Sequence, residues 1–336
     1  MVSLKDVALE CGVSVATVSK ALNGHSDVGA ATTQRIREKA RSMGYSPNTA
    51  ARALKTHKTH NIGVLFMDEA QSGLTHHYFS NVLEGFRVAA EKYGYDITFI
   101  NNNKNIDHTS YYERCISRGV DGVVIACVNF EAPFVKELLS GNIPLVTIDH
   151  VFNQCSAVVS DNVNGMKDLA EYIVSQGHKK IAYIHGEPSS VTRDRITSFY
   201  KTLYEHDIDV PEEYVIESRY QDTLGAVECT KRLMALKERP TCIIYPDDFS
   251  CIGGMNALTH MGFSIPDDIS IAGYDGQQLS EVLRPALTTL RQDTKKIGAT
   301  AAEELIQRIE RPKTTIVGQV LIEGRLVKGT SVGKIQ

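Results

Sequence analysis

Residues 3–23 read SLKDVALECGVSVATVSKALN, and apolar residues recur in this stretch every three or four positions. Such spacing is typical of short helices with one buried face. Ser3 and Ser14 are residue types that commonly cap the start of a helix, and Gly12 is of the type that commonly ends one. The stretch therefore predicts two short helices joined by residues 12–14, which is a helix-turn-helix.

The residues after this stretch predict a third helix and then a linker. The third helix is expected over residues 31–43, where Ile36, Ala40 and Met43 can close a three-helix core. Residues 47–60 favour a helix but allow only about two turns, which is too short to be stable alone. We expect residues 1–46 to form the helix-turn-helix domain and residues 47–60 a linker that orders when something holds it.

From residue 61 onward, apolar strand candidates alternate with amphipathic helices. Continuous apolar strands separated by helices favour a parallel, doubly wound sheet. Nine strands are many for one sheet, so we expect residues 61–336 to form two α/β lobes with a cleft between them. The strand candidates are residues 62–67, 96–100, 122–127, 145–149, 157–161, 180–185, 215–219, 242–245 and 269–274. The helix candidates include residues 79–93, 166–176, 196–206, 226–236 and 297–309.

Charge is distributed unevenly along the chain. Residues 1–60 carry nine Lys or Arg and four Asp or Glu, whereas the whole chain has a net charge of −4. A basic head on an acidic body indicates a polyanionic partner for the head alone.

Several classes of protein and site are disfavoured by composition. Nothing near Met1 resembles a signal peptide and no apolar run could span a bilayer, so we expect a cytoplasmic protein without a membrane partner. The seven cysteines include no Cys-x-x-Cys pair, which favours buried thiols over disulfides or a zinc site. His76, His77 and His150 do not form a metal-binding pattern, so we expect neither a metal nor a cofactor.

Several stretches resemble one known family. They are residues 4–23, the run Met43-Gly44-Tyr45-Ser46-Pro47-Asn48 with the Ala-rich segment that follows it, Gly273-Tyr274-Asp275-Gly276, and residues 285–292. Together they closely resemble the lactose/galactose repressor (LacI/GalR) family. The resemblance implies a bacterial sequence-specific DNA-binding transcription regulator, with a repressor of carbohydrate-utilisation genes as the default expectation.

The resemblance places the second helix in the major groove of a double-stranded DNA operator. It puts Val15, Ala16 and Lys20 at base edges, where small apolar side chains suit thymine methyl groups and Lys20 can donate to guanine. The family more often carries Arg at position 20, so we expect weaker discrimination of guanine here. The side chains placed for backbone phosphate contacts are Ser3, Thr17, Ser19 and Asn23.

The resemblance also gives the linker a role. In the family this segment folds into a hinge helix on DNA, and a leucine from each subunit enters the minor groove, where wrapping of the bent site offsets the unstacking of a base step. The corresponding residues here are Ala51, Arg52, Leu54 and Lys55. Because two hinge helices must pair, a homodimer and a near-palindromic operator are expected.

The body is similar to periplasmic sugar-binding proteins, which bind ligand between two lobes at the carboxyl ends of strands. Three aspartates follow strand candidates, Arg195 heads an Arg-x-x-x-Phe sequence close to the Arg-x-x-Gly-Phe of relatives, and three aromatic residues hold positions where relatives place aromatic walls. Asp247 and Asp248 stand where the family usually has Asn-Asp. The candidate effector-binding residues are Tyr78, Phe79, Asp149, Arg195, Tyr220, Asp247 and Asp275. Carboxylates, a guanidinium and aromatic faces suit a sugar or sugar derivative.

Other functions fit the sequence less well. An enzyme is disfavoured because the sequence has no P-loop, no Gly-x-Gly-x-x-Gly and no Gly-x-Ser-x-Gly motif, so no catalytic residue is assigned. A sugar-binding protein without DNA control is disfavoured by the helix-turn-helix. A regulator that responds to a purine or to a phosphosugar protein remains the alternative. The sequence decides neither between induction and co-repression nor between dimer and tetramer, and induction is the default.

Overall fold

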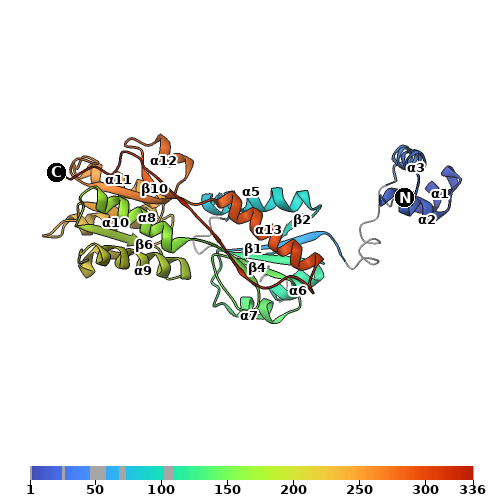
Figure 1. The fold of residues 1–336 in the computed structure, drawn as a ribbon, viewed down its shortest axis with the longest axis horizontal. Helices are drawn as coiled ribbons and strands as arrows, with labels where there is room; N and C mark the ends of the chain where they lie inside the picture. Colours follow the sequence, from blue (N-terminus) through green and yellow to red (C-terminus); the bar gives the residue numbers. More distant parts are fainter. Residues whose placement is uncertain (1, 25–26, 46–57, 68–72, 102–108, 336) are drawn as a thin grey trace. The chain divides into compact units, whose positions relative to one another are not determined.

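The structure, a computed structural model, describes residues 2–24, 27–45, 58–67, 73–101 and 109–335. The chain forms two compact units, residues 1–59 and residues 60–336. We call the first unit the head and the second the body, and Figure 1 traces both along the sequence. In the part of the chain that the structure describes, no helix is both long and apolar enough to cross a membrane.

The head consists of helices α1 (Leu4–Cys11), α2 (Val15–Leu22) and α3 (Ala30–Ser42). Ser3 caps α1 in a reciprocal arrangement with Asp6, and Gly12 ends this helix in the left-handed conformation with φ 63°. The Ser14 hydroxyl accepts a hydrogen bond from the Thr17 backbone N–H at 3.1 Å and so caps α2. Apolar residues from all three helices, such as Val7, Val18 and Ile36, form a closed core. The predicted helix-turn-helix is therefore confirmed.

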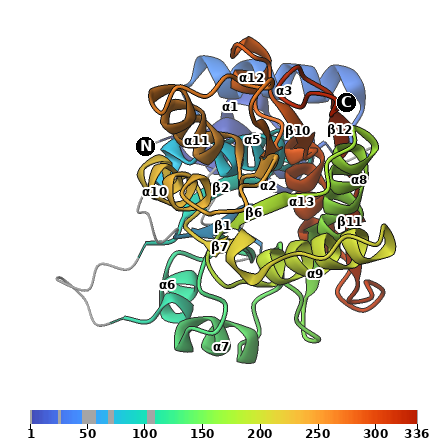
Figure 2. The same cartoon turned by 90° about the vertical axis from the view of Figure 1, so that its left-hand side faces the viewer.

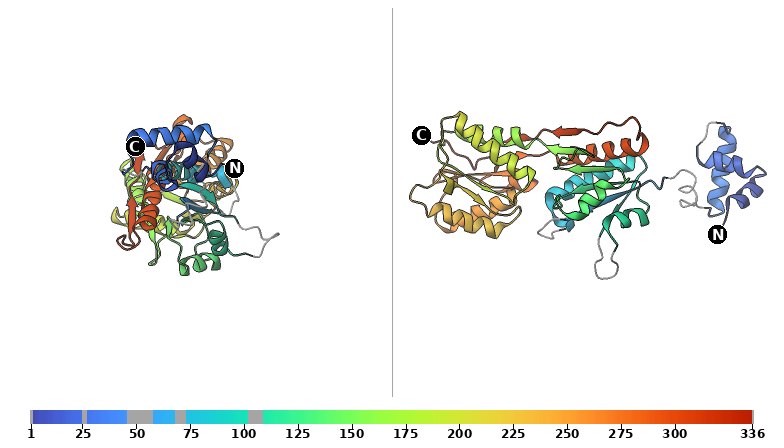
Figure 3. Two further views of the ribbon diagram at one scale, coloured as in Figure 1. Left: turned by 90° about the vertical axis from the view of Figure 1, so that its right-hand side faces the viewer. Right: turned by 90° about the horizontal axis from the view of Figure 1, so that it is seen from below.

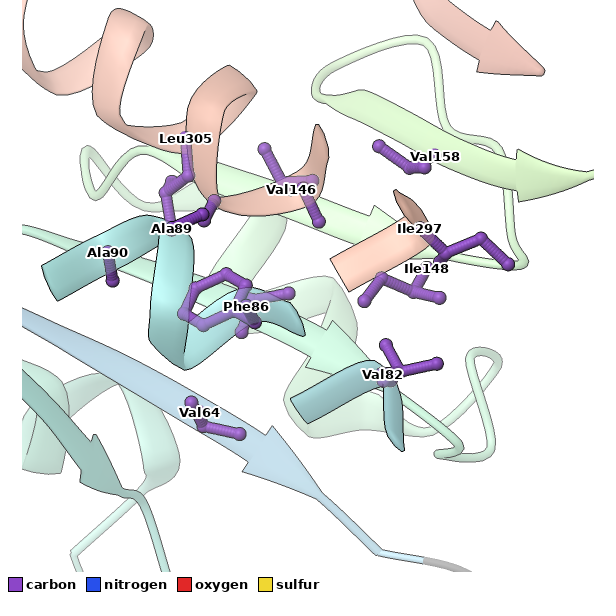
Figure 4. Packing of buried hydrophobic residues seen from close by; sticks show 14 of the residues in the cluster. Val64, Val82, Phe86, Ala89, Ala90, Val146, Ile148, Val158, Ile297 and Leu305 are labelled. Carbon is purple, nitrogen blue, oxygen red and sulfur yellow. The ribbon is translucent and has the colours of Figure 1, made fainter. Parts of the chain in front are cut away.

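One lobe of the body, the N-lobe, is built on a six-stranded parallel sheet. Its strands are β1 (Asn61–Phe66), β2 (Asp96–Phe99), β3 (Gly122–Ala126), β4 (Leu145–Ile148), β5 (Ser156–Ser160) and β11 (Gln319–Ile322), arranged in the order β11-β5-β4-β3-β1-β2. Val64 of β1 faces a core shared with α5 (His77–Lys92) and α13 (Thr294–Glu310) (Figure 4). Leu65, the next residue, faces the opposite core, shared with α6 (Tyr111–Ser117) and α7 (Pro133–Ser140). Both faces of the sheet are therefore covered.

The other lobe, the C-lobe, repeats this architecture. Its strands are β6 (Ile181–His185), β7 (Val215–Glu217), β8 (Cys242–Ile244), β9 (Ser270–Asp275), β10 (Thr288–Arg291) and β12 (Arg325–Val327), in the order β12-β10-β9-β8-β6-β7, and β12 alone among them pairs antiparallel. Helices α8 (Asn162–Ser175) and α9 (Ser190–Glu205) pack on one face of the sheet, and α10 (Thr223–Met234) and α11 (Asp248–His260) on the other (Figure 2). The remaining short elements are α12 (Gln278–Val282) and the 3-10 turns η1 (Gly73–Thr75) and η2 (Glu212–Tyr214).

The chain passes between the two lobes three times, from β5 to α8, from β10 to α13 and from β11 to β12. The right-hand view of Figure 3 shows the body with these connecting segments between the lobes. The prediction of two α/β lobes in place of one large sheet is confirmed. Because strands of both lobes end next to these connections, polar residues after the strands can meet between the lobes.

All five helix candidates named for the body were predicted to start too late, by two to six residues, and the differences are largest for α8 and α9. Helices α8 and α9 begin at Asn162 and Ser190, before the predicted residues 166 and 196. The side chain of Asp161 accepts from the Asn164 backbone N–H at 3.0 Å, and that of Ser189 accepts from the Thr192 backbone N–H at 3.1 Å. These caps allow each helix to begin before its apolar spacing does.

Helices α5 and α13 approach so closely that a glycine is required at their contact. A Cβ atom on Gly298 would lie 1.8 Å from the Val82 carbonyl oxygen. We therefore expect Gly298→Ala to destabilise the body by about 3 kcal/mol, since backbone atoms cannot rotate away as a side chain can. Urea unfolding measures this change. Gly318→Ala is the matched control, because its Cβ would meet nothing within 4 Å, and equal effects of the two substitutions would contradict the predicted contact.

Candidate functional site

Helix α2 presents one face to solvent and buries the other. Val18 and Ala21 are buried, whereas Val15 is 41% exposed and Ala16 and Lys20 are also exposed. Lys20 Nζ forms an ion pair with the Asp27 carboxylate in the loop that follows α2. The structure thus brings the three predicted base-reading residues to the free surface of one capped helix.

The four predicted phosphate contacts already take part in local hydrogen bonds. The Ser3 hydroxyl donates to Asp6 Oδ2 at 2.8 Å, and the Thr17 hydroxyl is 2.8 Å from that of Ser14. Asn23 Nδ2 donates to the Ser19 carbonyl oxygen at 2.7 Å. These bonds orient the side chains at the ends of α1 and α2. The predicted hinge residues Ala51, Arg52, Leu54 and Lys55 lie outside the described residues.

A cavity of about 870 Å³ lies between the two lobes of the body. Its lining includes residues at or just after the ends of strands β3, β4, β6, β7, β8, β9 and β10, together with residues of α5 and α9. All seven predicted effector residues line it, namely Tyr78, Phe79, Asp149, Arg195, Tyr220, Asp247 and Asp275. The structure therefore brings together side chains that are separated by up to about two hundred positions in the sequence.

Asp149 is held in place on the N-lobe side of the cavity. It follows β4 in the left-handed region, with φ 60°, which Asp tolerates better than most residues. Its Oδ2 accepts from the Tyr78 hydroxyl at 2.8 Å, and its Oδ1 accepts from the Ser160 backbone N–H at 3.0 Å. Burial raises the pKa of Asp149, and burial together with the Asp149 charge raises the pKa of Tyr78 well above its usual value. Tyr78 is therefore a neutral donor.

Arg195 provides a fixed positive charge on the C-lobe side. Only 3% exposed, it projects from α9 and stacks over the Tyr274 ring with the guanidinium carbon 3.6 Å from the ring centroid. Its Nε donates to Asn162 Oδ1 at 2.7 Å and its Nη1 to the Pro246 carbonyl oxygen at 3.2 Å. These contacts fix the plane of the guanidinium, so its remaining N–H groups point in set directions.

Asp247 and Asp275 add two carboxylates from neighbouring strand ends. Asp247 caps α11, accepting from the Ser250 backbone N–H at 2.8 Å and from the Gln221 backbone N–H at 2.7 Å. Asp275 has φ 95° and accepts from Gln292 Nε2 at 2.7 Å. Burial and the charge of Asp275 raise the pKa of Asp247 to about 6, and burial also raises the pKa of Asp275.

Asp248 differs from its neighbour, although both follow the same strand. Its Oδ2 accepts from the Gln277 backbone N–H at 2.7 Å and its Oδ1 from the Thr289 hydroxyl at 2.7 Å. It is 1% exposed and does not belong to the cavity lining. Asp248 therefore joins β9 and β10 to the start of α11.

Several cavity residues were missed by the sequence analysis. Gln292 directly follows β10, a strand that was not predicted, so the strand-end rule that found Asp275 did not reach it. Two contacts also cross between the lobes: Gln221 Nε2 lies 3.2 Å from His76 Nδ1, and the Ser190 hydroxyl donates to the Asp149 carbonyl oxygen at 2.9 Å. Loop residues of this kind carry no periodic signal in the sequence.

The raised pKa of Asp247 gives a test of the cavity's electrostatics. The folded state binds this proton more tightly than the unfolded state, where the pKa is near 3.8, so the carboxylate lowers stability as the pH rises from about 4 to about 6. We expect Asp247→Asn to gain up to about 3 kcal/mol relative to wild type between pH 4 and pH 7.5. Urea unfolding at both pH values measures the gain. The exposed Asp209→Asn serves as the control, and a pH-independent difference for Asp247→Asn would contradict the account.

Two sequence families match separate parts of the chain. The family described as "Bacterial regulatory proteins, lacI family" matches residues 3–48, which contain the three head helices. The family described as "Periplasmic binding protein-like domain" matches residues 170–332, which span most of the C-lobe and the returning segments of the N-lobe. The two matches agree with the division into head and body.

Known proteins match over 82% to 100% of the chain. The HTH-type transcriptional repressor PurR of Mannheimia succiniciproducens is 30% identical over 340 residues and covers 100% of both chains. A structure of the Lac repressor dimer bound to operator and the anti-inducer ONPF has a TM-score of 0.80 at 25% identity, with 99% of each chain covered. A LacI family regulator from Enterococcus faecium, solved with bound ribose, has a TM-score of 0.71 at 26% identity and covers 82% of this chain and 100% of its own.

Proposed function

Because the chain belongs to the LacI family of bacterial regulatory proteins, we propose that it is a homodimeric repressor that releases its operator when a sugar or sugar derivative binds between the lobes. The chain is a DNA-binding transcription regulator with an effector-binding body. The proposal concerns three points: which residues contact DNA and effector, the chemical class of the effector, and assembly as a dimer.

The inter-lobe cavity is the observation that carries the effector part of the proposal. It places three carboxylates and one guanidinium beside Tyr78, Phe79 and Tyr220. A ring that bears several hydroxyls can donate to the carboxylates, accept from the guanidinium and lay its apolar edge against an aromatic face. A purine offers far fewer donors to three carboxylates. The ribose bound to the Enterococcus relative supports the same choice.

The exposed face of α2 carries the DNA part of the proposal. Val15, Ala16 and Lys20 would contact base edges, and Ser3, Thr17, Ser19 and Asn23 would contact phosphates. Residues 1–46 would form the reading domain. Residues 47–60 would form the hinge, with Ala51, Arg52, Leu54 and Lys55 at the minor groove. The operator complex of the Lac repressor dimer supports pairing of two heads on one site.

Effector binding would change operator affinity by changing the orientation of the two lobes. A ligand that contacts Asp149 on one lobe and Arg195 on the other favours one arrangement of the two. The chain crosses between the lobes at three connections, which are the places where a change of angle can occur. Coupling of about 1–3 kcal/mol would change operator affinity roughly 5- to 150-fold.

Footprinting of the full-length protein across bacterial genomic DNA tests the operator claim. We expect near-palindromic sites with a central CG-type step, because two identical heads face each other across the hinge. Each half-site should lose protection in a Lys20→Ala variant. Scattered protection without a shared sequence would refute the proposal that this head reads an operator.

A further inference from the structure

The inter-lobe cavity carries more negative than positive charge. Its acidic lining residues are Glu131, Asp149, Glu187, Asp247 and Asp275, and its basic ones are Arg193, Arg195 and the histidines His76, His150 and His185. Among the described residues, Asp149, Asp247 and Asp275 form no ion pair with any lysine or arginine, although Arg195 is close enough to act on two of them through its charge. A buried carboxylate without a paired cation is unfavourable unless something else supplies positive charge.

The carboxylates also act on one another. The charge of Asp275 raises the pKa of Asp247, and the charge of Asp149 raises that of Asp275, in each case after the larger effect of burial. Arg195 offsets part of this repulsion, but two of its nitrogens already donate to Asn162 and to the Pro246 carbonyl oxygen. Negative charge therefore outweighs positive charge around Asp247 and Asp275.

Gln292, beside Asp275, adds a buried acceptor without a donor. It lines the cavity, is 5% exposed, and donates from Nε2 to Asp275 Oδ1 at 2.7 Å. The carboxylate fixes the direction of the amide, because a flipped amide would place two oxygens together. Its Oε1 then has no hydrogen-bond partner within the described part of the chain. A buried acceptor of this kind costs free energy until a donor reaches it.

We propose that the effector is an amino sugar whose protonated amine lies against Asp247 and Asp275. This inference rests on the proposed function, in which the same cavity holds a sugar or sugar derivative. An ammonium group supplies a positive charge and three donors beside two carboxylates that form no ion pair with a described lysine or arginine. The hydroxyls of the sugar would donate to Asp149 and accept from Arg195. Phosphorylated and acidic sugars would add negative charge beside unpaired carboxylates and are expected to be rejected.

Matched sugars test the amine directly. Calorimetric titration of the full-length protein at pH 7 would compare glucosamine, galactosamine, mannosamine and the chitosan dimer with their hydroxyl counterparts glucose, galactose, mannose and cellobiose, and with their N-acetyl forms. We expect at least one amine to bind at least tenfold more tightly than both of its counterparts. An N-acetyl or hydroxyl form that binds as tightly as its amine overturns the inference, as does a panel in which no amine binds.

Two variants test whether the preference for the amine depends on a carboxylate in the cavity or on negative charge elsewhere on the lobe. Asp247→Asn keeps a residue that caps a helix well, so the variant should fold, and we expect it to reduce the preference for the amine at least fivefold. Asp209→Asn removes an exposed carboxylate of the same lobe and should leave that preference unchanged. An equal preference in wild type and Asp247→Asn overturns the placement of the amine. Tight binding of a neutral sugar would overturn the inference about the amine but not the proposed sugar-responsive repressor. Failure to find an operator would overturn the proposed repressor and would not test the amine.

Discussion

With alanine at position 275, ligand binding to the body should weaken at least about 100-fold, and operator affinity should no longer respond to the sugar that stabilises wild type. The Asp275 carboxylate projects from the end of β9 into the inter-lobe cavity. Hydrogen bonds to a charged group contribute about 1.5–3 kcal/mol each, and a ligand near both carboxylate oxygens loses two of them. Thermal shift and calorimetric titration against the same sugars measure the loss.

The variant's operator affinity without ligand distinguishes a lost effector site from a damaged protein. Asp275 belongs to the body, whereas the reading helix belongs to the head. Removing one of three neighbouring carboxylates also relieves repulsion, so the fold should persist. We expect operator affinity within about twofold of wild type. A ligand that stabilises Asp275→Ala as much as wild type would remove this residue from the site.

Replacing Lys20 with alanine should weaken operator binding about 30-fold at fixed salt. Lys20 is the one residue among the three proposed base contacts that carries a charge, and it would donate to a guanine in each half-site. A loss of roughly 1 kcal/mol at each of two half-sites multiplies to that factor. Fluorescence anisotropy on the selected operator, and on the same operator with the guanine replaced, measures both affinity and discrimination.

Two matched substitutions in the head sharpen this prediction. Lys39 lies on α3, away from the reading helix, and its Nζ is 2.8 Å from Glu10 Oε2 of α1. Lys39→Ala should therefore leave base discrimination unchanged. Asp27→Asn releases Lys20 from its ion pair and removes a negative charge that repels phosphate, so it should tighten binding severalfold. Equal loss of discrimination in Lys20→Ala and Lys39→Ala would show that Lys20 does not read a base.

The sequence predicted the elements whose signals are local and the site residues that follow them. Ser3, Gly12 and Ser14 set the limits of α1 and α2 where they were expected, because capping is a property of single residues and their neighbours. Asp149 was found because it follows the buried strand β4, and Asp275 because it ends the largely buried strand β9. The aromatic walls and Arg195 were placed by family resemblance alone.

The parts that could not be predicted depend on contacts across the fold. Strands β10, β11 and β12 are three or four residues long and two of them are partly exposed, so they lack a continuous apolar run. Missing β10 also hid Gln292. Asp247 and Asp248 are identical side chains at adjacent positions. The direction of the chain into α11 decides that Asp247 lines the cavity, whereas Asp248 ties the start of α11 to Gln277 and to Thr289 of β10.

The response of operator affinity to ligand tests the central claim most directly. The measurement is the Kd of the wild-type, full-length protein for its selected operator at fixed salt, without ligand and with a saturating concentration of the sugar that stabilises the body. If ligand between the lobes controls the head, the Kd should rise roughly 5- to 150-fold. A Kd that stays the same while the body is fully occupied would contradict the account.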